Sequence, residues 1–435
     1  PNTVLNGGFM SNLVTDPYAV FSVPQVPKPP YLTPITDPTF GTKIIRIAGD
    51  PGTPIKALNG TGTWGTDVRH HYNDDQPWNA DGSLIAIQNE GSGAYPDLVF
   101  LDGNTYQPKY LKCSNYKNYD DRWHPRLEYK NIRINVRRDA AVLEWFDVVN
   151  CVQVRAWNLP FLAYDDIAQN PSADGRFIAL WSASQGKVFV VDMDAWPTQR
   201  IGPAYDFKTN CGLSDCTVDH LYITPSGKYI VAMYAGDHPR VFDVDPNTLA
   251  ISPHPQPAGS PECAGQDPAK GYVFDVGHEA AAMNPFDNNE EVIVGQKRSW
   301  CPSTVNGVTL GQTVMVRLRD NKVTPLTYGG NEAYSYHNSS LNYWYFPGWV
   351  YVSHWPGDGK RFNDEIIAVK LDGSQSVMRF AHDHTDTTNC YRCEAHPVPS
   401  RDGTRIIFAS SWTLNCGSAC GSQSNPQAYV IDARP

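Results

Sequence analysis

The sequence lacks the features of a membrane protein and of a nucleic-acid-binding protein. No apolar run reaches the roughly eighteen residues that a membrane-spanning helix needs. Charged residues are only 18% of the chain, and 45 Asp and Glu against 35 Lys and Arg give a formal net charge of −10. Binding to a phosphate backbone depends on clustered Lys and Arg. We therefore expect no nucleic acid and no membrane among the partners.

Several catalytic signatures and long amphipathic helices are missing as well. The sequence contains no nucleophile elbow, no P-loop and no dinucleotide fingerprint, which argues against serine-hydrolase and nucleotide chemistry. What it has instead is 12% aromatic residues with 34 Gly and 35 Pro. This composition favours short strands joined by turns and predicts an all-β fold.

Cysteine occurs in an even number. The ten residues are Cys211 near Cys216, Cys390 near Cys393, Cys416 near Cys420, and the more isolated Cys113, Cys151, Cys263 and Cys301. Only one CxxC unit is present, which favours disulfides over a zinc site and indicates a secreted, extracellular protein. Asn59 in "NGT" and Asn338 in "NSS" fit the glycosylation sequon, as expected of a eukaryotic glycoprotein.

A degenerate repeat runs along the chain. Its clearest copies are "QPWNADGSLIAI" at 76, "QNPSADGRFIAL" at 169, "LYITPSGKYIVAM" at 221, "MNPFDNNEEVIVG" at 283 and "HPVPSRDGTRIIFAS" at 396. Each copy is a turn followed by a run of strand-forming residues. Several copies precede a further strand that ends in Asp, as in "KVFVVDMD" at 187 and "AYVIDA" at 428.

The spacing of about fifty residues is that of a β-propeller blade. We predict a seven-bladed β-propeller that forms a single catalytic domain over residues 1–435, with residues 1–40 packing on or closing the ring. The C-terminal strand "AYVIDARP" is expected to pair near the N-terminus. A pair of β-sandwiches is the rival architecture, but it does not explain the repeat.

Polar residues stand just ahead of the repeated turns, where the inner strands of a propeller share one funnel. They are Asp75, Gln76, His124, Gln169, Asp219, His220, His278, His337, Glu394 and His396, joined by His70 and His71. Histidines gathered in this way suit proton transfer or metal binding. Hydrogen bonding between blades is the structural alternative for any single residue.

The chemistry expected of the funnel is recognition of an acidic sugar. Arg69, Arg126 and Arg392 could grip a carboxylate through their planar forks. Tyr72, Trp123, Tyr164 and Tyr336 are expected to bind the substrate, with Trp78 and Trp344 as further rings that could stack on sugars, although most aromatic residues pack in the core. His or Tyr beside Arg suits β-elimination from a uronic acid, because a cation stabilises the carboxylate while the C5 proton leaves.

Three segments carry a family resemblance: "RHHYNDDQPWNADGSLIAIQN", "GHEAAAMNP" and "AHDHTDTTNCYRCEAHPVPSRDGTRIIFASSW". They resemble the β-propeller polysaccharide lyases, which include oligogalacturonate lyases and ulvan lyases. With "YLTPITDPTFGTKIIRIAGD", the sequence is most similar to the fungal L-rhamnose-α-1,4-D-glucuronate lyase subgroup. The resemblance implies exo-type elimination at rhamnosyl-glucuronate ends of gum arabic or arabinogalactan, which releases rhamnose and leaves an unsaturated uronate.

The resemblance also implies site residues. "GHE" and "EAHP" are similar to the metal-holding segments of oligogalacturonate lyases, which gives ligand roles to His278 and His396, and we add Asp219 and Glu394 to this set. Glu394 replaces a histidine of that family's pattern. The expected cofactor is therefore a divalent metal, calcium first, with manganese and zinc as alternatives.

Catalytic roles follow from the "HHY" and "RWHP" segments, which resemble regions that supply histidines to the active sites of these lyases. His71 and His124 are the expected acid-base residues, His70 and His220 support them, and Arg126 or Arg392 neutralises the uronate carboxylate. Bacterial relatives are assigned activity on the opposite face of the ring, and an active site on that face is an alternative for this chain. A hydrolytic α-L-rhamnosidase, another uronate lyase and a non-catalytic sugar-binding propeller are the alternative functions, and a monomer is the simplest expectation.

Overall fold

Short antiparallel strands make up almost all the regular structure of the computed structural model, which describes residues 8–118, 120–137, 139–163, 170–263, 265–388 and 390–435. These ranges contain 31 strands and the three short 3₁₀ helices η1 (Leu127–Tyr129), η2 (Pro268–Lys270) and η3 (Tyr391–Cys393). The all-β prediction is confirmed. Tyr164 and Gln169 lie outside the described residues.

The chain divides into two units. The first unit comprises residues 1–112, 311–313 and 326–435, and the second comprises residues 113–310 and 314–325. Most sheets are small and antiparallel with strands that follow one another along the chain, whereas one larger sheet of the first unit joins strands from both chain ends. Such consecutive sheets are the blades of a β-propeller, and the propeller fold predicted from the repeat is confirmed, while the number of seven blades stays a prediction.

The second unit contains four sheets of four strands. They are β9 (Asp120–Trp123), β10 (Ile132–Val136), β11 (Val142–Asp147) and β12 (Val152–Asn158); β13 (Phe177–Ser182), β14 (Lys187–Asp192), β15 (Arg200–Ile201) and β16 (Tyr205–Asp206); β17 (Val218–Ile223), β18 (Tyr229–Tyr234), β19 (His238–Val244) and β20 (Ile251–Pro253); β21 (Val276–Asn284), β22 (Glu290–Lys297), β23 (Thr313–Arg317) and β24 (Val323–Pro325). The predicted strands of the repeat coincide with β13, β14, β18, β19 and β22.

The first unit contains the strands from both ends of the chain. They are β1 (Ile35–Thr36), β2 (Lys43–Arg46), β3 (Pro54–Ala57), β4 (Gly60–Thr63), β5 (Asp67–Arg69), β6 (Leu84–Glu90), β7 (Leu98–Asp102), β8 (Pro108–Leu111), β25 (Ser335–Ser339), β26 (Trp349–His354), β27 (Glu365–Lys370), β28 (Val377–His382), β29 (Val398–Pro399), β30 (Arg405–Ser410) and β31 (Gln427–Asp432). One sheet runs β25-β26-β27-β28, β3 pairs with β4, and the remaining strands join in a larger sheet.

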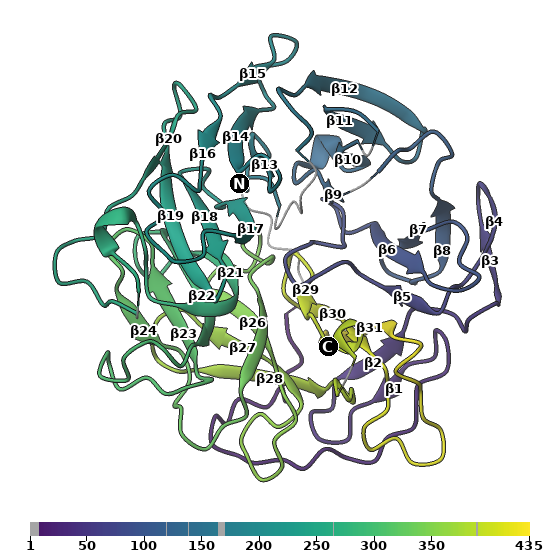
Figure 1. The fold of residues 1–435 in the computed structure, drawn as a ribbon. Helices are drawn as coiled ribbons and strands as arrows, with labels where there is room; N and C mark the ends of the chain where they lie inside the picture. Colours follow the sequence, from purple (N-terminus) through teal and green to yellow (C-terminus); the bar gives the residue numbers. More distant parts are fainter. Residues whose placement is uncertain (1–7, 119, 138, 164–169, 264, 389) are drawn as a thin grey trace. The chain divides into compact units, whose positions relative to one another are not determined.

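The larger sheet is where the chain closes on itself. The C-terminal β31 pairs antiparallel with β30 on one side and with the N-terminal β2 on the other, so Ile431 faces both Ile406 and Ile44. Figure 1 shows the yellow β31 beside the purple β2. A parallel bridge from Gln427 to Val68 links this region to β5. The predicted pairing of the C-terminal strand with N-terminal chain is confirmed.

The core explains why the repeat has continuous apolar strands. All six residues of β13 and all six of β18 are buried, as expected for strands covered on both faces. In the second unit, Phe177 of β13, Ile230 of β18 and Phe242 of β19 belong to one apolar cluster. Successive sheets of this unit therefore share packed apolar interfaces.

All ten cysteines form disulfides, as predicted. The bonds join Cys113 to Cys151, Cys211 to Cys216, Cys263 to Cys301, Cys390 to Cys393 and Cys416 to Cys420. Five disulfides are typical of an oxidising compartment. Among the described residues, no helix is long and apolar enough to span a membrane.

Candidate functional site

The strongest candidate site lies in the first unit, around His337, Glu394 and His396. His337 is on β25, whereas Glu394 and His396 follow the short helix η3. Glu394 Oε2 lies 3.6 Å from Nε2 of each histidine, and one donor atom from each residue lies within 4.8 Å of the others. Both histidine side chains are fully buried. We call these three residues the His-Glu-His centre.

Local irregularities aim these side chains at one another. The register between β25 and β26 shifts between Ser335 and Asn338, which places a bulge at His337. His396 has a φ of 43°, in the left-handed region that non-glycine residues seldom occupy. Bulges and strained backbone occur preferentially at functional sites. The departure from regular structure at both histidines is therefore consistent with a site.

Three hydroxyl and imidazole groups from neighbouring segments surround the centre. The hydroxyl of Tyr336 donates to Glu394 Oε1 at 2.9 Å, and the hydroxyl of Tyr72 lies 3.1 Å from His337 Nε2. His70 Nε2 donates to the backbone carbonyl of His396 at 2.5 Å. The structure thus brings the predicted residues His70, Tyr72, Tyr336, Glu394 and His396 together in one unit.

Burial sets the charge of these groups. It raises the pKa of Glu394 to about 7, although the Tyr336 hydrogen bond and the charge of Arg69 act in the opposite direction. Burial lowers the pKa of His70 to about 3, so this imidazole is neutral at physiological pH. Burial also raises the pKa of Tyr72 well above its ordinary value, which keeps its hydroxyl protonated.

The donor set fits a divalent transition metal. Two imidazole nitrogens and one carboxylate oxygen are the donors of the facial triad that binds such ions and leaves further positions open. A bound cation would favour the ionised form of Glu394, so metal binding should release a proton near neutral pH. A second grouping, Cys263 and Cys301 around Asp275, offers no thiolates because its two sulfurs are joined in a disulfide.

Two arginines predicted to bind a carboxylate, Arg392 and Arg69, lie in the first unit and have partners within the protein. Arg392 pairs through Nε with Asp67 at 2.5 Å and through Nη2 with Glu90 at 2.8 Å. Arg69 is 2% exposed and donates from Nη1 to the His71 carbonyl at 3.0 Å. Nε and Nη2 of Arg392 are therefore both engaged, and a substrate carboxylate that used either nitrogen would have to displace an acidic partner.

His71 is more open to solvent than its neighbour His70. Its side chain is 29% exposed, and its Nδ1 lies 3.9 Å from Asp75 Oδ2. The carboxylate of Asp75 thus faces the ring without a direct hydrogen bond at this distance. Of the adjacent histidines, His71 is the one placed to exchange protons with a bound molecule.

A second polar cluster lies in the second unit, around His220 on β17. His220 Nδ1 lies 3.0 Å from Asp219 Oδ2, and its Nε2 lies 3.1 Å from Glu279 Oε1. Burial alone would lower the pKa of His220, but Glu279 and Asp219 together raise it well above its ordinary value. The hydroxyl of Tyr222 donates to the same Glu279 oxygen at 3.1 Å. This imidazole is therefore held as a cation between two carboxylates.

The predicted ligands Asp219 and His278 belong to this second cluster. His278 is on β21, at a register shift between Gly277 and Ala280, and has a φ of 49°. Burial lowers its pKa to about 4. Asp219 also lines a cavity of about 370 Å³ with Thr217, Val218, Met233, Tyr234, Ala235, Gly236 and Asp237.

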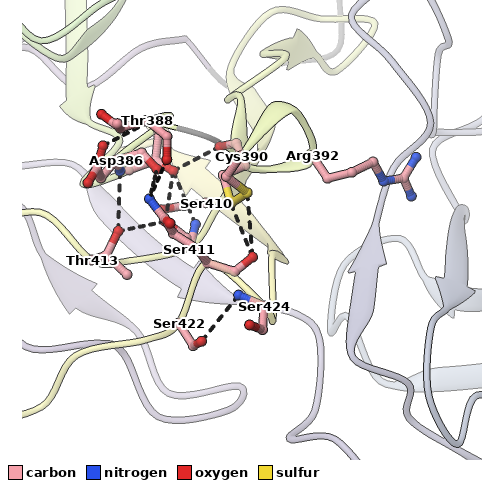
Figure 2. Close-up of a disulfide and its surroundings, with 12 residues drawn as sticks. Asp386, Thr388, Cys390, Arg392, Ser410, Ser411, Thr413, Ser422 and Ser424 are labelled. Atoms are coloured by element: carbon pink, nitrogen blue, oxygen red, sulfur yellow. Dashed lines mark hydrogen bonds between the residues drawn. A yellow bond between two sulfur atoms is a disulfide. The ribbon is translucent and has the colours of Figure 1, made fainter.

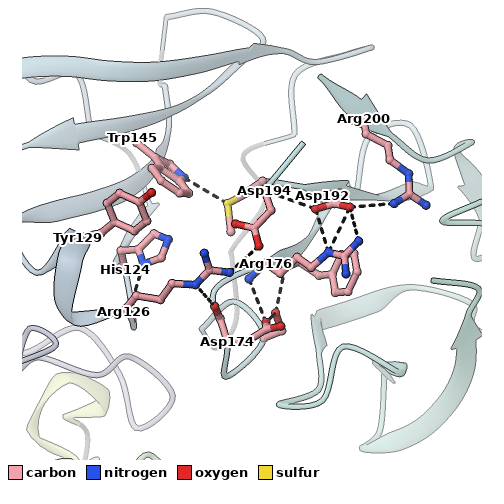
Figure 3. A network of polar contacts seen from close by, with 12 residues as sticks. His124, Arg126, Tyr129, Trp145, Asp174, Arg176, Asp192, Asp194 and Arg200 are labelled. Atoms are coloured by element: carbon pink, nitrogen blue, oxygen red, sulfur yellow. Dashed lines mark hydrogen bonds and ion pairs between the residues drawn. The ribbon is translucent and has the colours of Figure 1, made fainter. Parts of the chain in front are cut away.

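His124 and Arg126, two further predicted residues of the second unit, contact other side chains of the protein. His124 is fully buried against Tyr129 and Trp145, with ring centroids 4.7 and 4.4 Å away. Arg126 pairs with Asp194 at 2.6 Å and donates to the Asp174 carbonyl at 2.5 Å, as Figure 3 shows.

Trp123, predicted to bind sugar, and Asn338, in a predicted glycosylation sequon, are both buried. The ring of Trp123 is 1% exposed and lies under the guanidinium of Arg133, so it offers no free face to a sugar. Asn338 is fully buried and donates to the Tyr336 carbonyl at 2.8 Å. The folded chain therefore cannot carry a glycan on Asn338, which corrects the sequon assignment there, whereas Asn59 is exposed.

His337 was grouped with the polar residues ahead of the repeated turns but was not assigned to the metal. Its position in the repeat, equivalent to that of His396, is the signal that could have assigned it. Asp219 and His278 were placed in the metal set instead, and the structure groups Glu394 and His396 with His337.

Comparisons with known proteins show the fold. No family model matches the sequence, and no curated protein matches it. The chain is similar to an oligogalacturonate lyase in complex with manganese, with 12% identity, a TM-score of 0.56 and coverage of 95% of this chain and 98% of that one. An oligogalacturonate lyase from Vibrio parahaemolyticus aligns with 11% identity and a TM-score of 0.54, over 92% of this chain and 96% of that one.

Proposed function

We propose that the chain is a secreted, metal-assisted lyase that cleaves uronate-containing glycans by β-elimination. The observation that carries the proposal is the buried His-Glu-His centre, found in a fold similar to that of an oligogalacturonate lyase in complex with manganese. The five disulfides support an oxidising, extracellular location. We further propose that the protein acts as a monomer and a single domain.

The metal follows from the donors. His337, Glu394 and His396 would hold it, and the hydroxyl of Tyr336 orients the Glu394 carboxylate. A divalent ion there would withdraw charge from the uronate carboxylate. Calcium prefers six to eight oxygen ligands, whereas this centre offers two nitrogens, so we propose manganese, or zinc, in place of the calcium expected from the sequence.

The residues of the chain supply the proton transfers. We assign His71 as the base that takes the C5 proton, because its side chain is the exposed member of the pair and Asp75 faces its ring. The electrons of the C5–H bond form the C4=C5 double bond, and those of the C4–O4 bond leave with O4. The protonated hydroxyl of Tyr72 is suited to give O4 its proton, and Arg69 to stabilise negative charge nearby.

The substrate proposed first is a terminal L-rhamnosyl-α-1,4-D-glucuronate unit of gum arabic or arabinogalactan, from which rhamnose is released. Oligogalacturonate is the second candidate, favoured by the structural similarity to oligogalacturonate lyases. Both share the uronate carboxylate and the C5 proton on which the mechanism depends.

Product analysis tests this proposal. The protein is incubated separately with gum arabic and with oligogalacturonate while absorbance at about 235 nm and free rhamnose are measured. Absorbance that rises with rhamnose establishes exo-lyase action on rhamnosyl-glucuronate ends, and absorbance with oligogalacturonate alone establishes the second substrate. Release of rhamnose without an increase in absorbance would mean hydrolysis. If neither rhamnose nor absorbance increases, the protein is a non-catalytic sugar-binding protein.

A further inference from the structure

Two strongly exposed aromatic side chains stand at the ends of a series of ring contacts through the His-Glu-His centre. Tyr391 is 61% exposed and Trp355 is 43% exposed. The ring of Tyr391 lies 6.3 Å from that of His396, and Trp355 lies 4.9 Å from Tyr336. Between them, the rings of His396 and His337 are 3.9 Å apart, and those of His337 and Tyr336 are 4.2 Å apart.

Several contacts hold the backbone that carries Tyr391. Tyr391 begins helix η3, which the disulfide between Cys390 and Cys393 closes. Sγ atoms of both cysteines contact the Gln423 carbonyl, and the next residue, Arg392, is fixed by its two acidic partners. Figure 2 shows this disulfide beside its network of polar contacts, with Arg392 extending away from it. The exposed ring is therefore presented by an anchored segment.

Trp355 is anchored in a comparable way. It directly follows β26, its backbone N–H donates to the Tyr334 carbonyl at 3.0 Å, and its own carbonyl accepts from the Asp364 N–H at 3.4 Å. The indole makes a T-shaped contact with the ring of Tyr336, whose hydroxyl donates to Glu394. A large apolar ring left open to water on a fixed backbone favours a role in contact with a ligand.

We propose that Trp355 and Tyr391 are stacking platforms that bind the sugar rings on either side of the linkage cleaved at the centre. This inference rests on the proposed function and adds the residues that position the glycan. The faces of pyranose rings carry C–H groups that pack against aromatic rings, whereas their hydroxyls remain solvated at the edges. Anchored rings lose little conformational entropy when a sugar binds.

The test compares Trp355→Ala and Tyr391→Ala with two matched controls. Tyr18 and Tyr328 are exposed to 58% and 42%, and they form a separate exposed pair with ring centroids 4.6 Å apart. Tyr18→Ala therefore matches Tyr391→Ala, and Tyr328→Ala matches Trp355→Ala. Binding is measured as retardation in native gels containing gum arabic or polygalacturonate, together with kcat, KM and the melting temperature.

Each platform variant is expected to weaken sugar binding and raise KM about fivefold to tenfold with little change in kcat. Trp355→Phe should recover much of the loss, since it restores a ring, and the controls should behave like the wild type. Unchanged binding in both platform variants, or no binding by the wild type, would overturn the proposal. A wild type that is retarded but forms no unsaturated product would leave the platforms in place and refute the lyase function.

Discussion

At the scale of single residues, the proposed metal ligands are the most informative group. Because His337 supplies one of two nitrogen donors, His337→Ala should weaken Mn²⁺ binding by at least about tenfold. Tyr336→Phe removes the hydrogen bond that orients Glu394 and should weaken Mn²⁺ binding by a smaller factor. Equilibrium dialysis with Mn²⁺, Zn²⁺ and Ca²⁺ measures the affinities, and His254→Ala serves as the control because His254 pairs with Asp243 in the second unit.

Equal Mn²⁺ affinity in the wild type and His337→Ala would place the metal elsewhere. Tighter binding of Ca²⁺ than of Mn²⁺ by the wild type would restore the preference expected from the sequence and require oxygen donors beyond the three residues of the centre.

The ion pairs of Asp192 should make the stability of the protein depend on pH. Burial would raise the pKa of Asp192, but its ion pairs with Arg176 at 2.9 Å and Arg200 at 2.8 Å lower it (Figure 3). A lowered pKa means that this stabilisation is present above the unfolded-state pKa of about 4 and is lost as pH falls through the lower folded value.

Asp192→Asn should therefore lower stability at pH 7 by about 1–2 kcal/mol, a value that allows for solvent screening of the partly exposed arginines. The difference from the wild type should shrink below pH of about 4. Urea unfolding across pH measures it. Asp97→Asn breaks an exposed pair with Lys112 and should change stability far less. A constant difference at all pH values would refute the ionic explanation.

At this scale, residue type and repeat position together predicted several residues that the structure brings close to one another. Glu394, His396, His70 and Tyr72 were predicted as site residues, and the structure places all four at one centre. The sequence did not show how each histidine packs: His124 has the same position ahead of a turn, and its ring contacts Trp145. Burial by distant aromatic residues cannot be read from a local motif.

At the scale of elements, the turns between strands carry a specific requirement. Gly175 and Gly82 occupy equivalent Asp-Gly turns with φ of 70° and 71°. A Cβ on Gly175 would lie 2.7 Å from His124 Cε1, whereas a Cβ on Gly82 would have only Arg405 Nη2 nearby, at 3.9 Å. Gly82→Ala should cost about 1–2 kcal/mol for the backbone alone.

Gly175→Ala should cost about 1–3 kcal/mol more than Gly82→Ala, because it adds overpacking against a buried ring. Thermal and urea unfolding of the two variants provide the comparison. Equal losses would mean that His124 moves freely and is not locked between Trp145 and the turn.

The disulfides differ in the length of chain that they close. Cys113 and Cys151 are 38 residues apart, whereas Cys390 and Cys393 are 3 apart. Loop-closure entropy predicts a loss of about 4 kcal/mol for Cys113→Ser with Cys151→Ser and about 2 kcal/mol for Cys390→Ser with Cys393→Ser. Urea unfolding of the two double variants measures the losses, and the reverse order would contradict the entropic account.

Element prediction was most reliable where the pattern was strictly local. Asp-Gly and Ser-Gly turns followed by apolar runs correctly indicated β6, β13, β18 and β30. The outer strands β15, β16 and β20 have two or three residues each. Segments this short carry no periodicity, and sheet pairing alone defines them.

At the scale of the whole molecule, the repeat predicted the fold class before any strand was paired, because each copy is one sheet that cannot bury both faces alone. The pairing of the strand "AYVIDA" with N-terminal chain was also predicted from the repeat, and β31 does pair with β2. The sequence did not predict which residues β31 pairs with, Lys43–Arg46 of β2. Pairing between distant segments depends on the completed sheet.

We propose that a metal held by the His-Glu-His centre supports elimination from a uronate. The most direct measurement is the initial rate of absorbance increase at about 235 nm on the better of the two substrates, before chelation, after chelation and after addition of Mn²⁺, for the wild type and for His337→Ala. We predict that chelation abolishes the wild-type rate and that added Mn²⁺ restores it. His337→Ala should be inactive under all three conditions and have a near-normal melting temperature. A full rate in the metal-stripped protein, or in His337→Ala, would contradict the proposal.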